Sequence, residues 1–462
     1  MEAQKRLSRS GQSQRTFGCE FEWCVAFLWE DEVTPRSGGT AKLPPVIRVP
    51  KRIRDEIPSH APKFKRHVYA FDYILLEIAR TLDQNGLSVQ TIGGPVSIKD
   101  LPQYQLAPFR GWKVKTDRTV QAPEEYPEFY WCPVEVTSPA ELASDEAFGA
   151  VSKAIDLLTS KYWMRVNPSC GFHVHVGQGG HLLELRELRR VAGILWAADP
   201  LLACLHPPER RFNYWAQSIR ERSILAHGAK ADSYTTDEGD RTYHGLANVE
   251  KDLFQAVTAK AGEEIARTFS NLSLGDVLKG SSDTSYVCSR KRNGRRIFLP
   301  KYTMEDESRL KRVAEYGGDC AVLEPKVRSD PGVFYGVKEL LSCQGWPVIP
   351  FLLEATRRPN YSFTAYTQNR LQNEYSRVRT VEFREAAGTM SGKWAATWAR
   401  ICVGIYDWAV HAPVDQYLAV LNNCDRAAKG GEYDVVDFLD QLGLSVESAI
   451  AEQRCNSQAL WD

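Results

Sequence analysis

Four separated segments of the sequence carry acidic, imidazole or guanidinium side chains at alternating positions. In FGCEFEW, which begins at Phe17, the aromatic residues and Cys19 fall on one face of an expected strand, and Glu20 and Glu22 share the other face. Two such carboxylates lie about 6.7 Å apart, two steps of ~3.3 Å each, and they repel each other unless a cation or a proton lies between them. The same pattern is also typical of a half-exposed strand with two solvated glutamates.

The other three segments repeat this alternation. In PVEVTSP, valines flank Glu135 and face the opposite way. In CGFHVHVG, the imidazoles of His173 and His175 project together from the face opposite the apolar residues, and in TVEFRE the side chains of Glu382 and Arg384 share the polar face. Taken singly, each segment also fits a surface strand, a pair of structural histidines or an ordinary salt bridge.

If the four segments belong to one sheet, its polar face carries four carboxylates, two imidazoles and a guanidinium. An oxygen-rich ligand set favours Mg²⁺ or Mn²⁺, which complete their coordination with water and substrate phosphates. An arginine beside them can contact phosphate through two parallel hydrogen bonds. Zinc is less suitable, because the carboxylates outnumber the nitrogen ligands and no cysteine cluster is evident. The pattern therefore predicts phosphoryl-transfer chemistry.

The rest of the sequence predicts the elements that position these side chains. Strands and helices alternate without the regular β-α-β rhythm of a doubly wound sheet, so we expect an α+β fold, an antiparallel sheet with helices on one face. Strands are expected at 16–26, 171–176 and 379–385, with short strands between 112 and 139. Apolar periodicity predicts helices at 68–83, 144–163, 181–198, 393–411, 414–422 and 434–442.

The domain organisation follows from shifts in composition. Residues 1–15 are polar and basic and are predicted to be a flexible tail, and residues 16–425 form the expected catalytic domain. Within it, residues 30–66, rich in Pro, Gly, Lys and Arg, and the weakly patterned residues 228–330 are predicted insertions. Residues 426–462 form an expected C-terminal helical extension.

Composition narrows the functional class. The chain has 462 residues with 58 basic and 58 acidic side chains, so no overall positive field attracts nucleic acid or a membrane surface. The segment Arg290–Arg296 is typical of a nucleic-acid patch, but we interpret it as a solvated basic loop beside a turn. The 11 cysteines are dispersed without a CxxC pair, and the first 15 residues lack an apolar signal core. We expect a cytoplasmic protein that binds neither nucleic acid nor membranes.

Five motifs in order resemble a known family. FGCEFEW, GWKVKTD, VEVTSP, NPSCGFHVHVG and TVEFREAAGT resemble the amidoligase family common in fungi, which is grouped with glutamine synthetase and glutamate–cysteine ligase as carboxylate–amine ligases. The string from Asn167 to His175 also resembles a glutamine synthetase active-site strand, and Glu382 to Arg384 resembles that fold's late metal-and-phosphate strand. The resemblance implies a glutamine-synthetase-like catalytic domain whose curved antiparallel sheet binds MgATP on its concave face.

The resemblance also implies residue roles. His175 would contact the γ-phosphate, Arg384 would stabilise the transferring phosphoryl group, and Arg211 would face ATP or substrate, with Arg210 as an adjacent competitor. His173 would bind metal or phosphate. Two or three Mg²⁺ ions, or Mn²⁺, would be held by Glu20, Glu22, Glu135, His173 and Glu382.

The chain departs from the family pattern at two places. Asp117-Arg118-Thr119 stands where family members have Asp-Gly-Ser, so Asp117 is interpreted as a turn residue. Ala386 and Ala387 stand where the family often has a histidine, so a contact made by that histidine is absent or replaced.

These observations lead to a functional expectation with two alternatives. The expected function is ATP-dependent amide formation between small-molecule carboxylate and amine substrates through an acyl-phosphate, in a specialised-metabolite pathway. A metal-dependent hydrolase built on His173 and His175 is one alternative, and a non-catalytic binding protein on the same fold is the other. The sequence identifies neither the substrates nor the general base, and it leaves the oligomeric state open.

Overall fold

A computed structural model describes most of the chain: residues 15–35, 45–58, 60, 63–92, 111–234, 292, 295–299, 303–314, 330–355, 358–372 and 378–457. The expected tail, apart from Arg15, and most of the expected 228–330 insertion lie outside these residues. Arg15 is buried, and its Nε donates to Asp407 Oδ1 at 2.8 Å.

The described strands form one sheet of ten strands, in which β1 is the long central member. The main path runs β3-β4-β5-β1-β8-β10-β9, and β2, β6 and β7 pair with the remaining parts of β1. The bounds are β1 (Thr16–Trp29), β2 (Ile47–Val49), β3 (Val89–Ile92), β4 (Trp112–Thr116), β5 (Tyr130–Thr137), β6 (Glu141–Leu142), β7 (Met164–Arg165), β8 (Gly171–Gly177), β9 (Tyr361–Ser362) and β10 (Thr380–Ala387).

Helices complete the fold. The longer ones are α3 (Phe71–Gln84), α4 (Asp145–Lys161), α5 (Leu185–Leu202), α10 (Met304–Ala314), α11 (Val333–Ser342), α14 (Gly392–His411), α15 (Val414–Ala428) and α17 (Ser445–Asn456). The shorter ones are α2 (Lys51–Asp55), α6 (Ile219–Arg222), α12 (Val348–Leu352), α13 (Gln368–Gln372) and α16 (Val435–Gln441), with 3-10 turns η1 (Lys63–Ala70), η2 (Ala203–Leu205), η3 (Pro208–Phe212), η4 (Ala231–Ser233) and η5 (Thr364–Tyr366). None of these described helices combines the length and apolar character needed to cross a bilayer.

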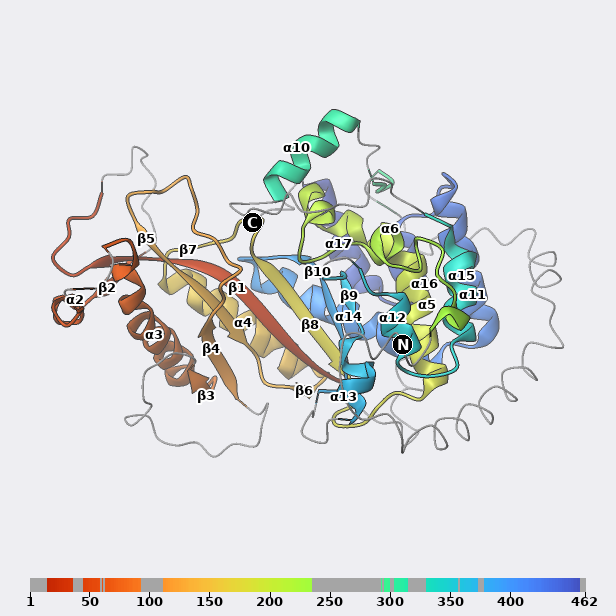
Figure 1. The fold of residues 1–462 in the computed structure, drawn as a ribbon, viewed down its shortest axis with the longest axis horizontal. Coiled ribbons are helices and arrows are strands. Elements are labelled where there is room, and N and C mark those ends of the chain that lie inside the picture. Colours follow the sequence, from red (N-terminus) through yellow and green to blue (C-terminus); the bar gives the residue numbers. More distant parts are fainter. Residues whose placement is uncertain are drawn as a thin grey trace.

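The apolar face of the sheet lies against helices α3, α4 and α14. In Figure 1, α4 and α14 are drawn behind the central strands, and α3 lies beside β3 and β4. Alternation in β1 places Phe17, Cys19 and Phe21 in this core, and β8 adds Phe172 and Val174. Because successive side chains point to opposite faces, the charged residues of the same strands lie on the other face of the sheet.

Most of the expected elements are present. The predicted antiparallel sheet is confirmed in most of its pairs, but β2 runs parallel to β1 and β3 runs parallel to β4. Helix α4 begins where the capping pattern predicts, since the Ser144 hydroxyl accepts from the Ala147 N–H at 3.2 Å. Helix α5 begins four residues later than predicted and continues through Pro200.

The residues assigned to insertions and to the C-terminal extension contribute to the same core. Ile47 and Val49 of β2 are buried in it, as are Val435, Phe438 and Leu439 of α16. The buried carboxylate of Asp434 binds both terminal nitrogens of Arg292 at 2.8 Å. The described part of the Arg290–Arg296 segment is therefore held by internal ion pairs.

Candidate functional site

Cross-strand register brings the predicted site residues together on the polar face. Glu20 on β1 lies opposite His173 on β8, and His175 on β8 lies opposite Glu382 on β10. Side chains directly opposite each other on one face are close enough to interact. Alternation along each strand predicts that these four residues share one face, and the register between the strands places them in contact.

A second set of opposed residues lies on the other side of β1. Glu22 faces Glu135 across the β1–β5 pair, and Glu135 faces Lys115 across the β4–β5 pair. The Lys115 ammonium lies 2.9 Å from Glu135 Oε1. Two buried carboxylates side by side therefore have a lysine as their neighbour.

All of these side chains except that of His175 line one cavity of about 380 Å³. Six residues predicted for the site line it: Glu20, Glu22, Glu135, His173, Glu382 and Arg384. Asp117 and four basic side chains complete its charged lining: Lys115, Arg210, Arg358 and Arg370. His175 lines an adjoining pocket of about 160 Å³ that shares Glu382 and Arg370 with the main cavity. A charged cavity of this size fits a polyanionic ligand with metal ions.

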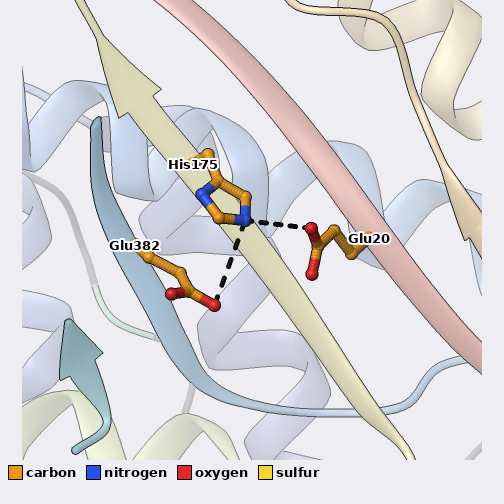
Figure 2. Close-up of side chains that lie close together, drawn as sticks. All are labelled: Glu20, His175 and Glu382. Atoms are coloured by element: carbon orange, nitrogen blue, oxygen red, sulfur yellow. Dashed lines mark ion pairs between the residues drawn. The ribbon is translucent and has the colours of Figure 1, made fainter. Parts of the chain in front are cut away.

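Glu20, His175 and Glu382 form what we call the first acidic group, in which one ligand atom from each residue lies within 4.8 Å of the others. Figure 2 shows the His175 imidazole between the two carboxylates, with Nε2 3.3 Å from Glu20 Oε1 and 3.9 Å from Glu382 Oε1. This nitrogen is buried and has no hydrogen-bond partner among the described residues. A buried nitrogen of this kind aimed at two carboxylates is suited to a metal ion.

Glu22, Asp117 and Glu135 form the second acidic group, again with one oxygen from each within 4.8 Å of the others. Glu22 and Glu135 are nearly fully buried. Asp117 follows β4 and accepts from both the N–H and the hydroxyl of Thr119 at 2.6 Å. The Asp-Arg-Thr sequence thus makes a side-chain-stabilised turn, and it also directs a carboxylate into the cavity.

His173 lies between the two groups. Its Nδ1 is 3.3 Å from Glu20 Oε2 and 3.9 Å from Glu382 Oε1, and its Nε2 is 3.9 Å from Glu22 Oε1. His173 and His175 therefore do not gather around one common point, and only His175 belongs to a three-residue donor group among the described residues.

Of the four arginines that line the cavity, Arg384 and Arg210 are joined through strand β10. Arg384 pairs with Glu382 two residues earlier on β10, and its Nε donates to the Trp215 carbonyl at 3.3 Å. Arg210, on η3, donates to the backbone carbonyls of Arg384 and Glu385 at 2.9 and 3.1 Å. Arg211 pairs with Glu221 and is not among the residues that line this cavity. Of the two adjacent arginines, it is Arg210 that faces the carboxylates.

The carboxylates of the site differ in the direction of their pKa shifts. Burial raises the pKa of Glu22, with Asp117 adding to the effect, and burial together with Glu20 raises the pKa of Glu135 to about 7. Although burial alone would raise it, His175 and His173 hold the pKa of Glu20 well below its usual range. Burial opposes charging of His175, yet Glu20 and Glu382 raise its pKa to about 9. Glu22, Glu135 and His175 therefore hold protons that a metal cation could replace.

Sequence reasoning missed Asp117 and Lys115 as site residues. Both were visible in GWKVKTD, where Lys115 alternates with the buried Val114 and so shares the face of the neighbouring carboxylates. Alternation indicates a face but not which strands are neighbours, and the position of β4 next to β5 supplied that information.

Comparisons with known proteins add one finding. A family model described as "Putative amidoligase enzyme" matches residues 72–269, which is less than half of the chain. The matched range contains Asp117, Glu135 and both site histidines, whereas Glu20 and Glu382 lie outside it. No curated protein and no solved structure matched the chain. Residues 72–269 are therefore similar to the amidoligase family.

Proposed function

We propose that this protein is an ATP-dependent carboxylate–amine ligase that makes an amide through an acyl-phosphate. The observation that carries the proposal is the single cavity in which two acidic groups face Arg210 and Arg384. The family match, which points to a ligase, supports the same class of reaction. The relation to glutamine synthetase rests on the sequence motifs alone.

The donor sets suit hard divalent cations. The first acidic group offers two carboxylates and one imidazole, and the second offers three carboxylates, so oxygen donors dominate both. Mg²⁺ or Mn²⁺ bound by these residues would neutralise phosphate charge and draw electrons from the transferring phosphorus. Glu20, His175 and Glu382 would hold one ion.

The chain's own residues have separate tasks in this reaction. Arg384 reaches the cavity beside Glu382, where its guanidinium would stabilise negative charge on the transferring phosphoryl group. Arg210 donates to the carbonyls of Arg384 and Glu385, and by holding this part of β10 it would orient Arg384. A carboxylate oxygen of the substrate would attack the γ-phosphorus as its bond to ADP breaks, and the amine would then displace phosphate from the acyl carbon with loss of a proton.

The histidine pair does not favour the hydrolase alternative. Both imidazoles contact Glu20 and Glu382, but among the described residues only His175 belongs to a three-residue donor group. We therefore propose the ligase, and we propose that it acts on small-molecule carboxylates and amines in a specialised-metabolite pathway.

Hydroxylamine trapping tests the reaction without knowledge of the natural amine. We expect hydroxamate and ADP from ATP, Mg²⁺, hydroxylamine and one member of a panel of carboxylic acids. The expected products appear only when all components are present. Formation of AMP and pyrophosphate would instead indicate an acyl-adenylate and would contradict the proposal.

A further inference from the structure

The two acidic groups differ in the hydrogen bonds that the protein forms with their side chains. In the first acidic group, the buried Nε2 of His175 has no hydrogen-bond partner among the described residues. In the second, the Gly171 N–H donates to Glu22 Oε2 at 2.6 Å, and Thr119 donates twice to Asp117. The first group, in which Arg384 pairs with Glu382, therefore keeps one unbonded imidazole nitrogen that faces both carboxylates. The carboxylates of the second group are already bonded to protein donors.

Lys115 completes the second acidic group. Its ammonium lies 2.9 Å from Glu135 Oε1, and the Thr137 hydroxyl donates to the same oxygen at 3.1 Å. The Glu135 side chain is 3% exposed, whereas that of Lys115 is 49% exposed. The lysine thus reaches a buried carboxylate from the open side of the cavity, where it also meets solvent and any bound ligand.

A divalent cation in the second acidic group would compete with this ammonium. Mg²⁺ lies about 2.1 Å from its oxygen ligands, so an ion on Glu135 would stand within a few ångströms of the Lys115 nitrogen. Two like charges at such a distance repel strongly near a protein surface. Either the divalent cation or the Lys115 ammonium must therefore leave Glu135.

We propose that Lys115 fills the second acidic group in the ligand-free protein, which then holds one divalent cation, at the first acidic group. The second cation enters together with an anionic ligand that draws the ammonium away from Glu135. This inference rests on the proposed function, because nucleotide phosphates are anions of the required kind. A lysine ammonium on a flexible stem readily exchanges a carboxylate for phosphate. The Glu135 carboxylate, left without the ammonium, then favours the metal ion.

Manganese binding tests the proposal without an activity assay. Mn²⁺ would be titrated into the wild-type protein and into Lys115→Met, and the free ion followed by electron paramagnetic resonance. We expect one Mn²⁺ per wild-type chain and a second one in Lys115→Met, bound at least about tenfold more tightly than in the wild type. Lys113→Met is the matched control, because Lys113 lies on the same strand and is not among the residues lining the cavity. It should bind one ion.

Addition of a non-hydrolysable ATP analogue tests the exchange. The wild type should then take up the second Mn²⁺, and Lys115→Arg should behave as the wild type does. Two equivalent ions in the ligand-free wild type, or equal stoichiometry in wild type and Lys115→Met, would overturn the role of Lys115. No uptake of a second ion with the analogue would overturn the exchange.

A double variant separates this inference from the proposed function. Glu20→Gln with Lys115→Met should lose the ion of the first acidic group and keep that of the second. Retention of that single ion together with absence of hydroxamate formation by the wild-type protein would refute the ligase and support the inference about Lys115. Loss of both ions would show that the second acidic group cannot bind a cation without the first, and would overturn the inference.

Discussion

Glu20 and Glu382 approach His175 from the two strands that flank it, and the three residues form one donor group. Removing one carboxylate charge should therefore remove the cation without disturbing the core on the opposite face. We expect Glu20→Gln or Glu382→Gln to reduce Mg²⁺-dependent hydroxamate formation by on the order of 100-fold.

The same variants should unfold within about 1 kcal/mol of the wild type in a urea titration. Glu141→Gln in the exposed strand β6 provides the control and should keep full activity. Full activity of either site variant would show that its carboxylate does not hold the essential ion.

Metal binding should depend on pH through His175. Its raised pKa of about 9 means that the metal-free folded chain binds this proton more tightly than the unfolded chain, so its stabilising effect is lost as pH rises toward 9. A metal ion needs the neutral imidazole, so each ion displaces one proton below that pH. We expect Mn²⁺ affinity at the first acidic group to rise about tenfold per pH unit between pH 6 and 8. A flat profile in calorimetric titrations would mean that His175 is not a ligand.

At the scale of the elements, the start of β8 is the most constrained part of the site. A Cβ atom on Gly171 would lie 2.6 Å from His173 Nε2 and 3.0 Å from Arg210 Nη2, while the Gly171 N–H binds Glu22. Gly171→Ala should therefore displace the imidazole or the guanidinium, lower the activity severely and cost about 1–3 kcal/mol in stability.

Gly149→Ala is the matched control for this substitution. Gly149 lies inside helix α4, and apart from its chain neighbours and the adjacent backbone of the same helix, no atom lies within 4 Å of the position that an alanine Cβ would take. Alanine should therefore stabilise the protein by about 0.5–1 kcal/mol and leave activity unchanged. Equal behaviour of the two variants in thermal unfolding and activity assays would argue against close packing at β8.

The element scale also shows how far the sequence could predict the site. Alternation in four segments placed Glu20, His173 and Glu382 on one face, because side-chain direction in a strand has a period of two. The choice between Arg210 and Arg211 could not be predicted, because it depends on the backbone carbonyls of β10 that receive the Arg210 side chain. Such contacts join segments far apart in the sequence.

At the scale of the whole molecule, Arg292 ties a distant segment to the C-terminal helices. It binds both oxygens of Asp434, which caps helix α16, and its Nε is 3.4 Å from Glu452 on α17. Local periodicity gave no sign of this pair, since the two residues are separated by 142 positions. The pair adds a polar link to the apolar contacts through which residues predicted as an extension share the main core.

Arg292→Met would leave the fully buried Asp434 carboxylate without its counter-ion. We expect a loss of about 3–5 kcal/mol in the free energy of unfolding. Arg309→Met, which breaks an exposed pair with Asp306 on α10, should cost less than about 1 kcal/mol. Similar small losses for both variants in denaturant titrations would show that the Arg292 contact is not structural.

The most direct test of the central claim is the binding of a non-hydrolysable ATP analogue with and without Mg²⁺, followed by thermal unfolding. The proposed ligase predicts stabilisation only when nucleotide and Mg²⁺ are both present, by about 2.7 kcal/mol at a ligand concentration 100-fold above Kd. Glu382→Gln should abolish the effect. If the nucleotide leaves the unfolding transition unchanged with or without Mg²⁺, the cavity is not an ATP site and the proposed ligase is wrong.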